Sequence, residues 1–369
     1  MFKKVKFIVL CVGGRAGSDF FHALMDNHDQ ISQLPGCIYY DEFYKKIKNE
    51  FDAKFILKTF LKDYNFLFNS KLSGSECHDK LGKNKKEKYK VDKVKFKKIF
   101  YKNFSKINTF NFENLINLLH YTYYLACNKK ITKIKYILLN LHHCERIKKI
   151  PSFNFRLIYM YRHPIAMVNS AVKSKIFTYK GSLFTPRSLL WYLKRVLFEV
   201  RILNDYCKKP IVIKLEDLHR DNKLLIQKLC KSLGITYKKT MLEPTFHNKR
   251  WWGDKFSGNN MPGINRKFEN KINSNFFYNK DIEIFEYLTN DIIKKFKYKF
   301  FVKPKKSFLN FFLPLKIEVF VLNFFWNNIK FKQILSFPFF YFLRITYFFK
   351  FLIYKKLNQK NFKINYFKK

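Results

Sequence analysis

The chain has 369 residues, enough for one large α/β domain or two smaller ones with a sizeable core. Its formal net charge of +46 would ordinarily indicate nucleic acid, an anionic membrane or an acidic substrate as the partner. Only 11 of the 73 basic residues are Arg, however, so we interpret much of the charge as a compositional bias toward Lys and other residues with A/T-rich codons. An Arg within a motif is correspondingly informative.

The seven cysteines are scattered, without a CxxC pair or the Cys/His spacing of a metal site. This usage argues against a disulfide framework and predicts reduced thiols in a cytoplasmic protein that holds no metal. Residues 1–6 are followed by a short apolar run that ends in glycines, which predicts a core strand and no signal peptide.

The first predicted unit is a strand, a small-residue loop and a helix. Apolar residues 5–12 form the strand, Gly13 to Asp19 form the loop, and apolar positions in 20–25 indicate the helix. Glycines allow close approach of a ligand, free N–H groups at a helix start attract anions, and Arg15 adds a planar cation. The unit predicts a phosphate or sulfate site, or else a connecting turn. It has neither the lysine of GxxxxGK[ST] nor a GxGxxG pattern, which disfavours an ordinary ATPase loop and a dinucleotide fold.

Three further apolar runs, 135–141, 155–161 and 210–215, predict buried parallel strands. Each is followed by helix or turn signals, so we expect an α/β fold with a parallel sheet flanked by helices. Residues 71–107 are rich in Gly, Ser, Asn and Lys and predict an exposed insertion or mobile loop.

A second anion motif follows the strand at 155–161. Arg162 stands at the strand end, Pro164 suits the first turn of a helix, and Ser170 falls two turns further on. The guanidinium and the hydroxyl can share one phosphate. Alone, the motif could be an ordinary turn with a surface arginine, but with the first loop it completes a pattern of two anion sites.

Together these motifs resemble the nucleotide motifs of the sulfotransferase family, which uses 3′-phosphoadenosine 5′-phosphosulfate. The resemblance is carried by Arg15-Ala16-Gly17-Ser18 with Asp26-Asn27-His28, and by Tyr161-Arg162-His163-Pro164 with Ser170. A third element, Val212 to Leu218, is similar to the family's strand-Glu-Asp-Leu segment, whose acidic pair is mainly structural. The resemblance implies a P-loop nucleotide-kinase-like domain over residues 1–300. It also implies donor contacts from Gly14, Arg15, Ala16, Gly17, Ser18, Asp19 and Phe20 to the 5′-phosphosulfate, and from Arg162 and Ser170 to the 3′-phosphate.

The sequence departs from the family pattern at two positions. Where the family has Ser-Gly-Thr-Thr, this chain has Ala16-Gly17-Ser18-Asp19, so a carboxylate replaces one phosphate-binding hydroxyl. Asp19 could cap the helix or bind a lysine, but it would also repel the donor. His163 stands where Asp is common in the family, which alters the turn.

Sulfuryl transfer needs a base near the acceptor proton and cations around the moving group. Arg15 suits the second role. For the base, His142 or His143 ends a predicted strand where cytosolic sulfotransferases carry a strand-end histidine, and an imidazole suits the task. The alternative is Glu42, with its neighbour Asp41, after the first helix, where the tyrosylprotein branch carries a catalytic Glu.

The segment Arg250 to Gly258 loosely resembles the family's late loop, which closes over the nucleotide. Lys255 or Arg250 could reach the 3′-phosphate, and the paired tryptophans Trp251 and Trp252 could stack on adenine or pin the loop to the core.

From residue 301 the chain is aromatic and basic, and no apolar run reaches the roughly 18–20 uninterrupted residues of a membrane span. Residues 301–369 therefore predict a helical tail that lies in the headgroup region of an anionic inner membrane surface, or else helices that cap the core.

The function that these features favour is transfer of a sulfuryl group to an acceptor hydroxyl, on a glycan or glycolipid if the tail touches lipid. One alternative is a small-molecule or nucleotide kinase, which the missing loop lysine and the lack of an acidic Mg²⁺ motif disfavour. The other is a non-catalytic basic protein on membranes or RNA. Because no aromatic-studded sheet or arginine-rich segment is evident, nucleic acid is not an expected partner.

Overall fold

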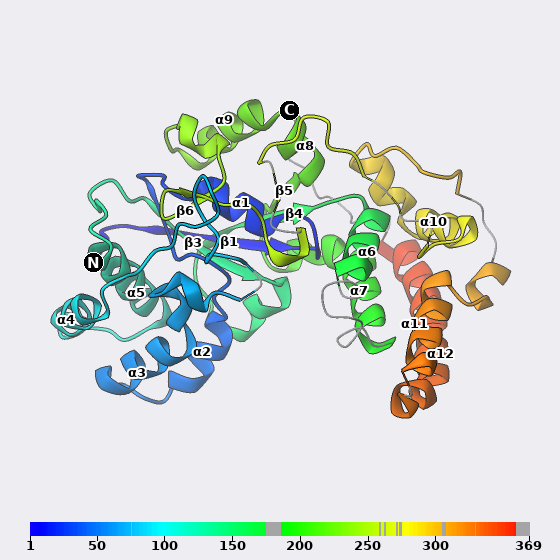
Figure 1. Cartoon of the computed structure of the whole chain (residues 1–369), viewed down its shortest axis with the longest axis horizontal. Coiled ribbons are helices and arrows are strands. Elements are labelled where there is room, and N and C mark those ends of the chain that lie inside the picture. The colour runs from blue at the N-terminus through cyan, green and yellow to red at the C-terminus, as the bar shows by residue number, and fades with distance from the viewer. Residues whose placement is uncertain are drawn as a thin grey trace.

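The computed structural model describes residues 1–74, 76–174, 186–257, 260–261, 263–270, 272, 275–304, 308–328 and 330–358. At its centre lies a five-stranded parallel sheet with strand order β2-β3-β1-β4-β5. The strands are β1 (Lys6–Val12), β2 (Ile31–Gln33), β3 (Tyr136–His142), β4 (Phe155–Tyr161) and β5 (Ile211–Lys214). Helices pack around this sheet (Figure 1), and its strands are almost fully buried. The expected α/β class with a parallel sheet is confirmed.

Helices follow β1, β4 and β5 in the chain, as the sequence predicts, and further helices lie between β2 and β3 and after β5. They are α1 (Ser18–Met25), α2 (Tyr40–Ile47), α3 (Ala53–Asp63), α4 (Lys93–Phe104), α5 (Phe112–Ala126), α6 (Pro164–Lys173), α7 (Pro186–Phe198), α8 (Leu215–Arg220), α9 (Asn222–Leu233), α10 (Asn279–Lys295), α11 (Lys316–Asn327) and α12 (Phe331–Asn358). A small antiparallel pair, β6 (Thr245–Phe246) and β7 (Lys249–Arg250), precedes the late loop.

The start of α1 depends on Gly17. This residue is the N-cap with φ of 83°, in the left-handed region, and a Cβ there would lie 2.5 Å from Leu215 Cδ1. Only glycine accepts both conditions without strain. The glycine therefore lets the loop after β1 turn into α1 directly against the start of α8.

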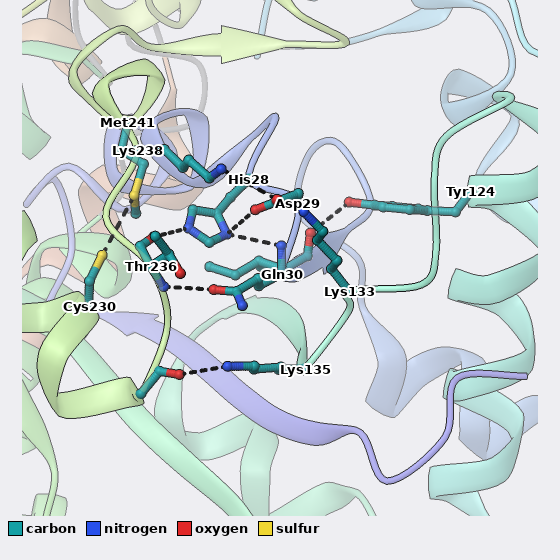
Figure 2. Close-up of polar contacts among 12 residues, drawn as sticks. His28, Asp29, Gln30, Tyr124, Lys133, Lys135, Cys230, Thr236, Lys238 and Met241 are labelled. Carbon is teal, nitrogen blue, oxygen red and sulfur yellow. Dashed lines mark hydrogen bonds and ion pairs between the residues drawn. The ribbon is translucent and has the colours of Figure 1, made fainter.

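Polar contacts tie the start of β2 to the segment after α9, as Figure 2 shows. The His28 ring accepts from the backbone N–H of Gln30 through Nδ1, so its Nε2–H donates to the carbonyl of Thr236 at 2.7 Å. The Thr236 N–H donates to Gln30 Oε1, also at 2.7 Å, and Lys135 Nζ donates to the carbonyl of Gly234. His28, which belongs to the first sequence motif, therefore has a structural role in this interface.

The expectation that 71–107 is an exposed insertion is wrong for much of the segment. His78, Leu81, Phe96 and Phe100 are completely buried. Phe96 and Phe100 lie one helical turn apart on α4 and face α5 and the core, while the lysines between them point outward. Lysine density concealed this helical periodicity in the sequence.

The C-terminal segment is mainly helical despite the lysines that interrupt its apolar runs, with a short 3-10 helix at Leu309–Phe312 ahead of α11 and α12. Leu309–Asn327 and Phe331–Leu357 are long and apolar enough to cross a membrane by length and composition alone, and 33% and 22% of their most apolar windows is buried. Both criteria are also met by core helices of soluble proteins.

Candidate functional site

A pocket of about 500 Å³ opens where the carboxyl ends of β1, β3, β4 and β5 meet. This is the edge at which parallel α/β sheets bind ligands. The described residues that line it are Arg15, Ala16, Gly17, Ser18, Asp19, Phe20, His142, Arg162, Asn169, Ser170, Lys173, Ser174, Leu215, His219, Trp251, Asp254, Phe256, Met261, Phe268, Glu269 and Ile272. Both sequence motifs therefore contribute to one cavity, although about 150 residues separate them in the chain.

Several of the residues singled out in the sequence do not line this pocket. Gly14 packs beside the Tyr192 ring. His143 lies edge-on to Trp191, with ring centroids 5.3 Å apart.

Glu42 is exposed and pairs with Arg146 at 3.1 Å, and the same guanidinium pairs with Asp41 at 2.5 Å. Lys255 begins a short 3-10 helix between two lining residues, Asp254 and Phe256. Of the proposed bases, only His142 is part of the cavity.

Arg15 occupies a strained position in the first loop. Its φ is 41°, a left-handed conformation that costs a non-glycine residue about 1–3 kcal/mol. Its Nη1 donates to Asp254 Oδ2 at 2.9 Å, and its guanidinium lies 4.8 Å from the centre of the Phe256 ring. Its buried Nε has no hydrogen-bond partner among the described residues, so this guanidinium retains the capacity to bind an anion.

Ser18 and His142 face each other across the pocket wall. Ser18 Oγ lies 3.2 Å from His142 Nδ1. His142 is placed there by an irregularity in the pairing of β1 with β3, and it has a φ of 64°. Burial lowers the pKa of His142 to about 3, and the nearby positive charges of Arg195 and Arg15 add to this effect. The imidazole is therefore neutral near pH 7.

Asp19 lies in the first turn of α1, at the end of the same loop. When its carboxyl is negatively charged, it repels an anion bound there. Burial raises its pKa to about 6, and repulsion from Asp254 adds to the shift, whereas Arg15 opposes it. Asn140 Nδ2 donates to Asp19 Oδ1 at 3.4 Å. The pKa of this carboxyl is thus close to neutral pH, so a small change in pH alters its charge.

The second motif is organised by Glu216. This carboxylate accepts from the His163 backbone N–H at 3.0 Å and from Asn270 Nδ2 at 2.5 Å. Asn270 Oδ1 in turn accepts from Arg162 Nε at 2.7 Å. The acidic residue therefore orients Arg162 toward the pocket through the turn that precedes α6, in keeping with the structural role implied by the resemblance.

Arg162 is a poorly compensated cation in this cavity. Burial lowers its pKa, and the positive charge of Arg15 lowers it further, although Glu216 acts in the opposite direction. The two motif arginines are therefore close enough to repel each other, and Ser170 stands on α6 in the same pocket. An anion bound here would relieve that repulsion.

A stack of flat side chains, which the sequence did not reveal, forms another wall of the pocket. The His219 ring lies between Phe20, at 4.7 Å, and Phe268, at 4.4 Å, and both pairs are nearly parallel. The Arg162 guanidinium lies 5.2 Å from the Phe268 ring centre. His219 and Phe268 belong to no motif, so only the folded chain brings them together.

The late loop is fixed to the body of the protein. Trp251 is buried, lines the pocket and donates through Nε1 to the carbonyl of Glu76 at 2.7 Å. Trp252 donates to the carbonyl of Gly82 at 2.6 Å, and the Arg250 guanidinium lies 4.0 Å from its ring. Gly258, the last residue of the sequence motif, lies outside the described residues.

All seven cysteines lie within the described residues, and none of them forms a disulfide bond. Within the described ranges, no group of three or more His, Cys, Asp or Glu side chains is arranged to hold a metal ion.

The sequence matches no family model and no curated protein. The solved structures that resemble the chain include three sulfotransferases. A sulfotransferase domain from the curacin biosynthetic pathway has 14% identity and a TM-score of 0.44, with coverage of 81% of this chain and 99% of that one. The sulfotransferase domain of the Synechococcus PCC 7002 olefin synthase has 12% identity and a TM-score of 0.41, with the same coverage. A sulfotransferase from Mycobacterium avium has 7% identity and a TM-score of 0.39, with coverage of 80% and 78%.

Proposed function

We propose that this protein is a sulfotransferase that moves a sulfuryl group from 3′-phosphoadenosine 5′-phosphosulfate to an acceptor hydroxyl. The observation that carries the proposal is the meeting of two arginine and serine pairs, Arg15 with Ser18 and Arg162 with Ser170, in one pocket. Each pair suits a phosphate or sulfate group. Two such pairs in one cavity suit a ligand with anionic groups at two places, as this donor has.

The electrostatics of the residues in this pocket support the same ligand. Arg15 has an unpartnered Nε, and Arg162 is destabilised by burial and by Arg15. The first N–H groups of α1 add partial positive charge beside Ser18. In the proposed complex, the donor displaces Asp254 from Arg15. The stack of Phe20, His219 and Phe268 lines the pocket and offers aromatic surface to the adenine.

In the proposed reaction the acceptor oxygen attacks sulfur while the bond between sulfur and the 5′-phosphate oxygen breaks. The electron pair leaves with the phosphate, and the acceptor proton passes to His142. Arg15 and the loop N–H groups stabilise the charge that develops on the leaving phosphate. Burial, together with its cationic neighbours, sets the low pKa of His142, and the negative donor raises that pKa, so the base gains strength when the donor is bound.

We further propose a hydroxyl on a glycan or glycolipid as the acceptor. The support for this is the apolar surface of the C-terminal helices, which would bring the enzyme to lipid.

The proposal is tested by titrating the full chain with 3′,5′-adenosine bisphosphate and, separately, with ATP·Mg²⁺ at moderate salt. We expect the bisphosphate to bind, and Arg162→Ala to weaken it by about 10- to 100-fold through loss of a charge-assisted contact. Arg156→Ala is the matched control, because Arg156 lies on β4, the strand that Arg162 follows, but is exposed to solvent and donates to the carbonyl of Ser232.

Two outcomes would contradict the proposal. Binding of ATP·Mg²⁺ alone would indicate a kinase. Binding of any polyanion that is salt-sensitive and equally reduced by both arginine variants would indicate a response to overall charge.

A further inference from the structure

The outward side of the two C-terminal helices carries large exposed apolar side chains, interrupted by the exposed Thr346 and Lys350 between Phe342 and Ile353. We call this surface the apolar outer face. It comprises Phe331, Leu335, Phe339, Phe342, Ile353 and Leu357 of α12, together with Val319 and Trp326 of α11. The six residues of α12 are each between 60% and 80% exposed. Their spacing of three or four residues, with a gap of eleven before Ile353, keeps them on one side of the helix.

The opposite side of α12 is already occupied. It packs against α7, α10 and α11 and buries Phe348 and Phe351. Arg344 is buried there too, and it donates to Glu318 Oε1 at 2.7 Å and to the carbonyl of Phe311 at 2.8 Å. The inner side therefore holds the helix pair in place. The apolar outer face makes no comparable contacts with the other described residues of the protein. A helix at a protein surface in water normally carries polar residues outward.

The charges of the segment match an anionic surface. Glu318 is the sole acidic residue of 308–358, and Arg344 neutralises it inside the protein. Lys332, Lys350 and Lys356 are exposed on α12. Lysines that alternate with large aromatic residues are typical of helices that lie in the headgroup region of a membrane. Trp326, 67% exposed near the end of α11, is the residue type enriched at such interfaces.

We propose that the apolar outer face is the docking surface for an anionic lipid bilayer, which takes the aromatic and aliphatic side chains into its headgroup–acyl boundary while the exposed lysines contact lipid phosphates. In Figure 1, α11 and α12 lie at the end of the molecule opposite α4, so a bilayer can approach them without meeting the first helices. The proposal rests on these helices alone and is independent of the reaction at the pocket.

The test is co-flotation of the full chain with vesicles of phosphatidylcholine containing about 30% phosphatidylserine. The variant Leu335→Glu/Phe339→Glu places two charges on the outer face. The matched control, Val94→Glu/Leu224→Glu, makes the same change in net charge at exposed apolar positions on α4 and α9. We expect the first variant to lower the partition coefficient at least about tenfold and the control to lower it about twofold or less. Each variant's thermal unfolding midpoint shows that it is folded.

Equal loss in both variants, or no binding of the unchanged protein to the vesicles, would overturn the proposal. If, instead, the unchanged chain sediments as a dimer and only the outer-face variant is monomeric, with no vesicle binding in either, then a second copy covers the surface. A second measurement does not depend on the glutamate variants. Brominated lipids should quench tryptophan fluorescence, and Trp326→Phe should remove most of that quenching; unchanged quenching in Trp326→Phe would contradict contact at this face.

Discussion

At the scale of single residues, the pocket concentrates unfavourable features that a purely structural loop would avoid. Arg15 and His142 both have left-handed backbone conformations without being glycine. Such conformations persist where the surrounding structure enforces them, and they cluster at functional sites. Arg162 is half-buried, with its pKa lowered by burial and by the positive charge of Arg15, and Asp19 is a carboxyl beside a proposed anion site. These features fit a cavity arranged around a charged ligand.

The pKa of Asp19 predicts how ligand affinity depends on pH. Its pKa is about 6, so the carboxyl is neutral well below pH 6 and negative well above it. A negative Asp19 repels the donor, so the affinity for 3′,5′-adenosine bisphosphate should fall as the pH rises from about 5 to about 8. In Asp19→Asn this component of the pH dependence should vanish, as calorimetric titrations across the range can measure. An identical pH profile in the variant would show that Asp19 does not face the ligand.

The proposed role of His142 as the base predicts how its substitution changes turnover. His142→Gln should lower kcat by about 10²- to 10⁴-fold, the usual contribution of a positioned base, while the affinity for the bisphosphate changes little. His143→Gln and Glu42→Gln, which alter residues outside the cavity, should retain turnover. Single-turnover release of the bisphosphate measures this step. A large loss in Glu42→Gln with normal turnover in His142→Gln would move the base to α2.

The sequence could identify the motif residues but not their charge states. Arg15, Ser18 and Arg162 stand out because each follows a predicted strand or opens a helix, and Ser170 because it lies on the helix that follows Arg162. Asp254, by contrast, reaches Arg15 from 239 positions away, and no local pattern signals that contact. Such pairings depend on how the late loop folds back, which is a property of the whole chain.

At the scale of elements, the strand and helix order was predictable because buried parallel strands are apolar throughout. The predicted run 155–161 matches β4, and 5–12 differs from β1 by one residue. β2 was missed because it has only three residues, too few for a recognisable pattern. The irregularity that positions His142 was also invisible, since it arises from the pairing of β1 with β3.

The turn from β1 into α1 gives a prediction about stability. Gly17→Ala places a methyl group 2.5 Å from Leu215 Cδ1 at a φ of 83°, so it should cost about 1–3 kcal/mol in the free energy of unfolding and weaken bisphosphate binding. Gly74→Ala is the control, because a Cβ there meets nothing within 4 Å. Denaturant unfolding of both variants measures the difference. Equal stability would mean that the loop does not need its present conformation.

At the scale of the whole molecule, the proposed site exists only because β1, β4 and the late loop converge on one edge of the sheet. The sequence motifs alone predicted two anion sites, and the fold places both in one cavity. The net charge of +46 is a property of the entire chain and does not distinguish this cavity from the rest of the surface. A decisive test must therefore distinguish specific binding of a nucleotide with two phosphates from general attraction of anions to a positively charged protein.

The most direct measurement is a thermodynamic cycle of binding affinities. It removes the 3′-phosphate from the ligand and, separately, the side chain proposed to bind that phosphate. The unchanged protein should bind 3′,5′-adenosine bisphosphate about 10- to 100-fold more tightly than 5′-adenosine monophosphate at the same salt concentration. In Arg162→Ala the two ligands should bind almost equally, while Arg156→Ala should preserve the difference. If the preference for the bisphosphate survives in Arg162→Ala, or is absent from the unchanged protein, the proposed nucleotide site is contradicted.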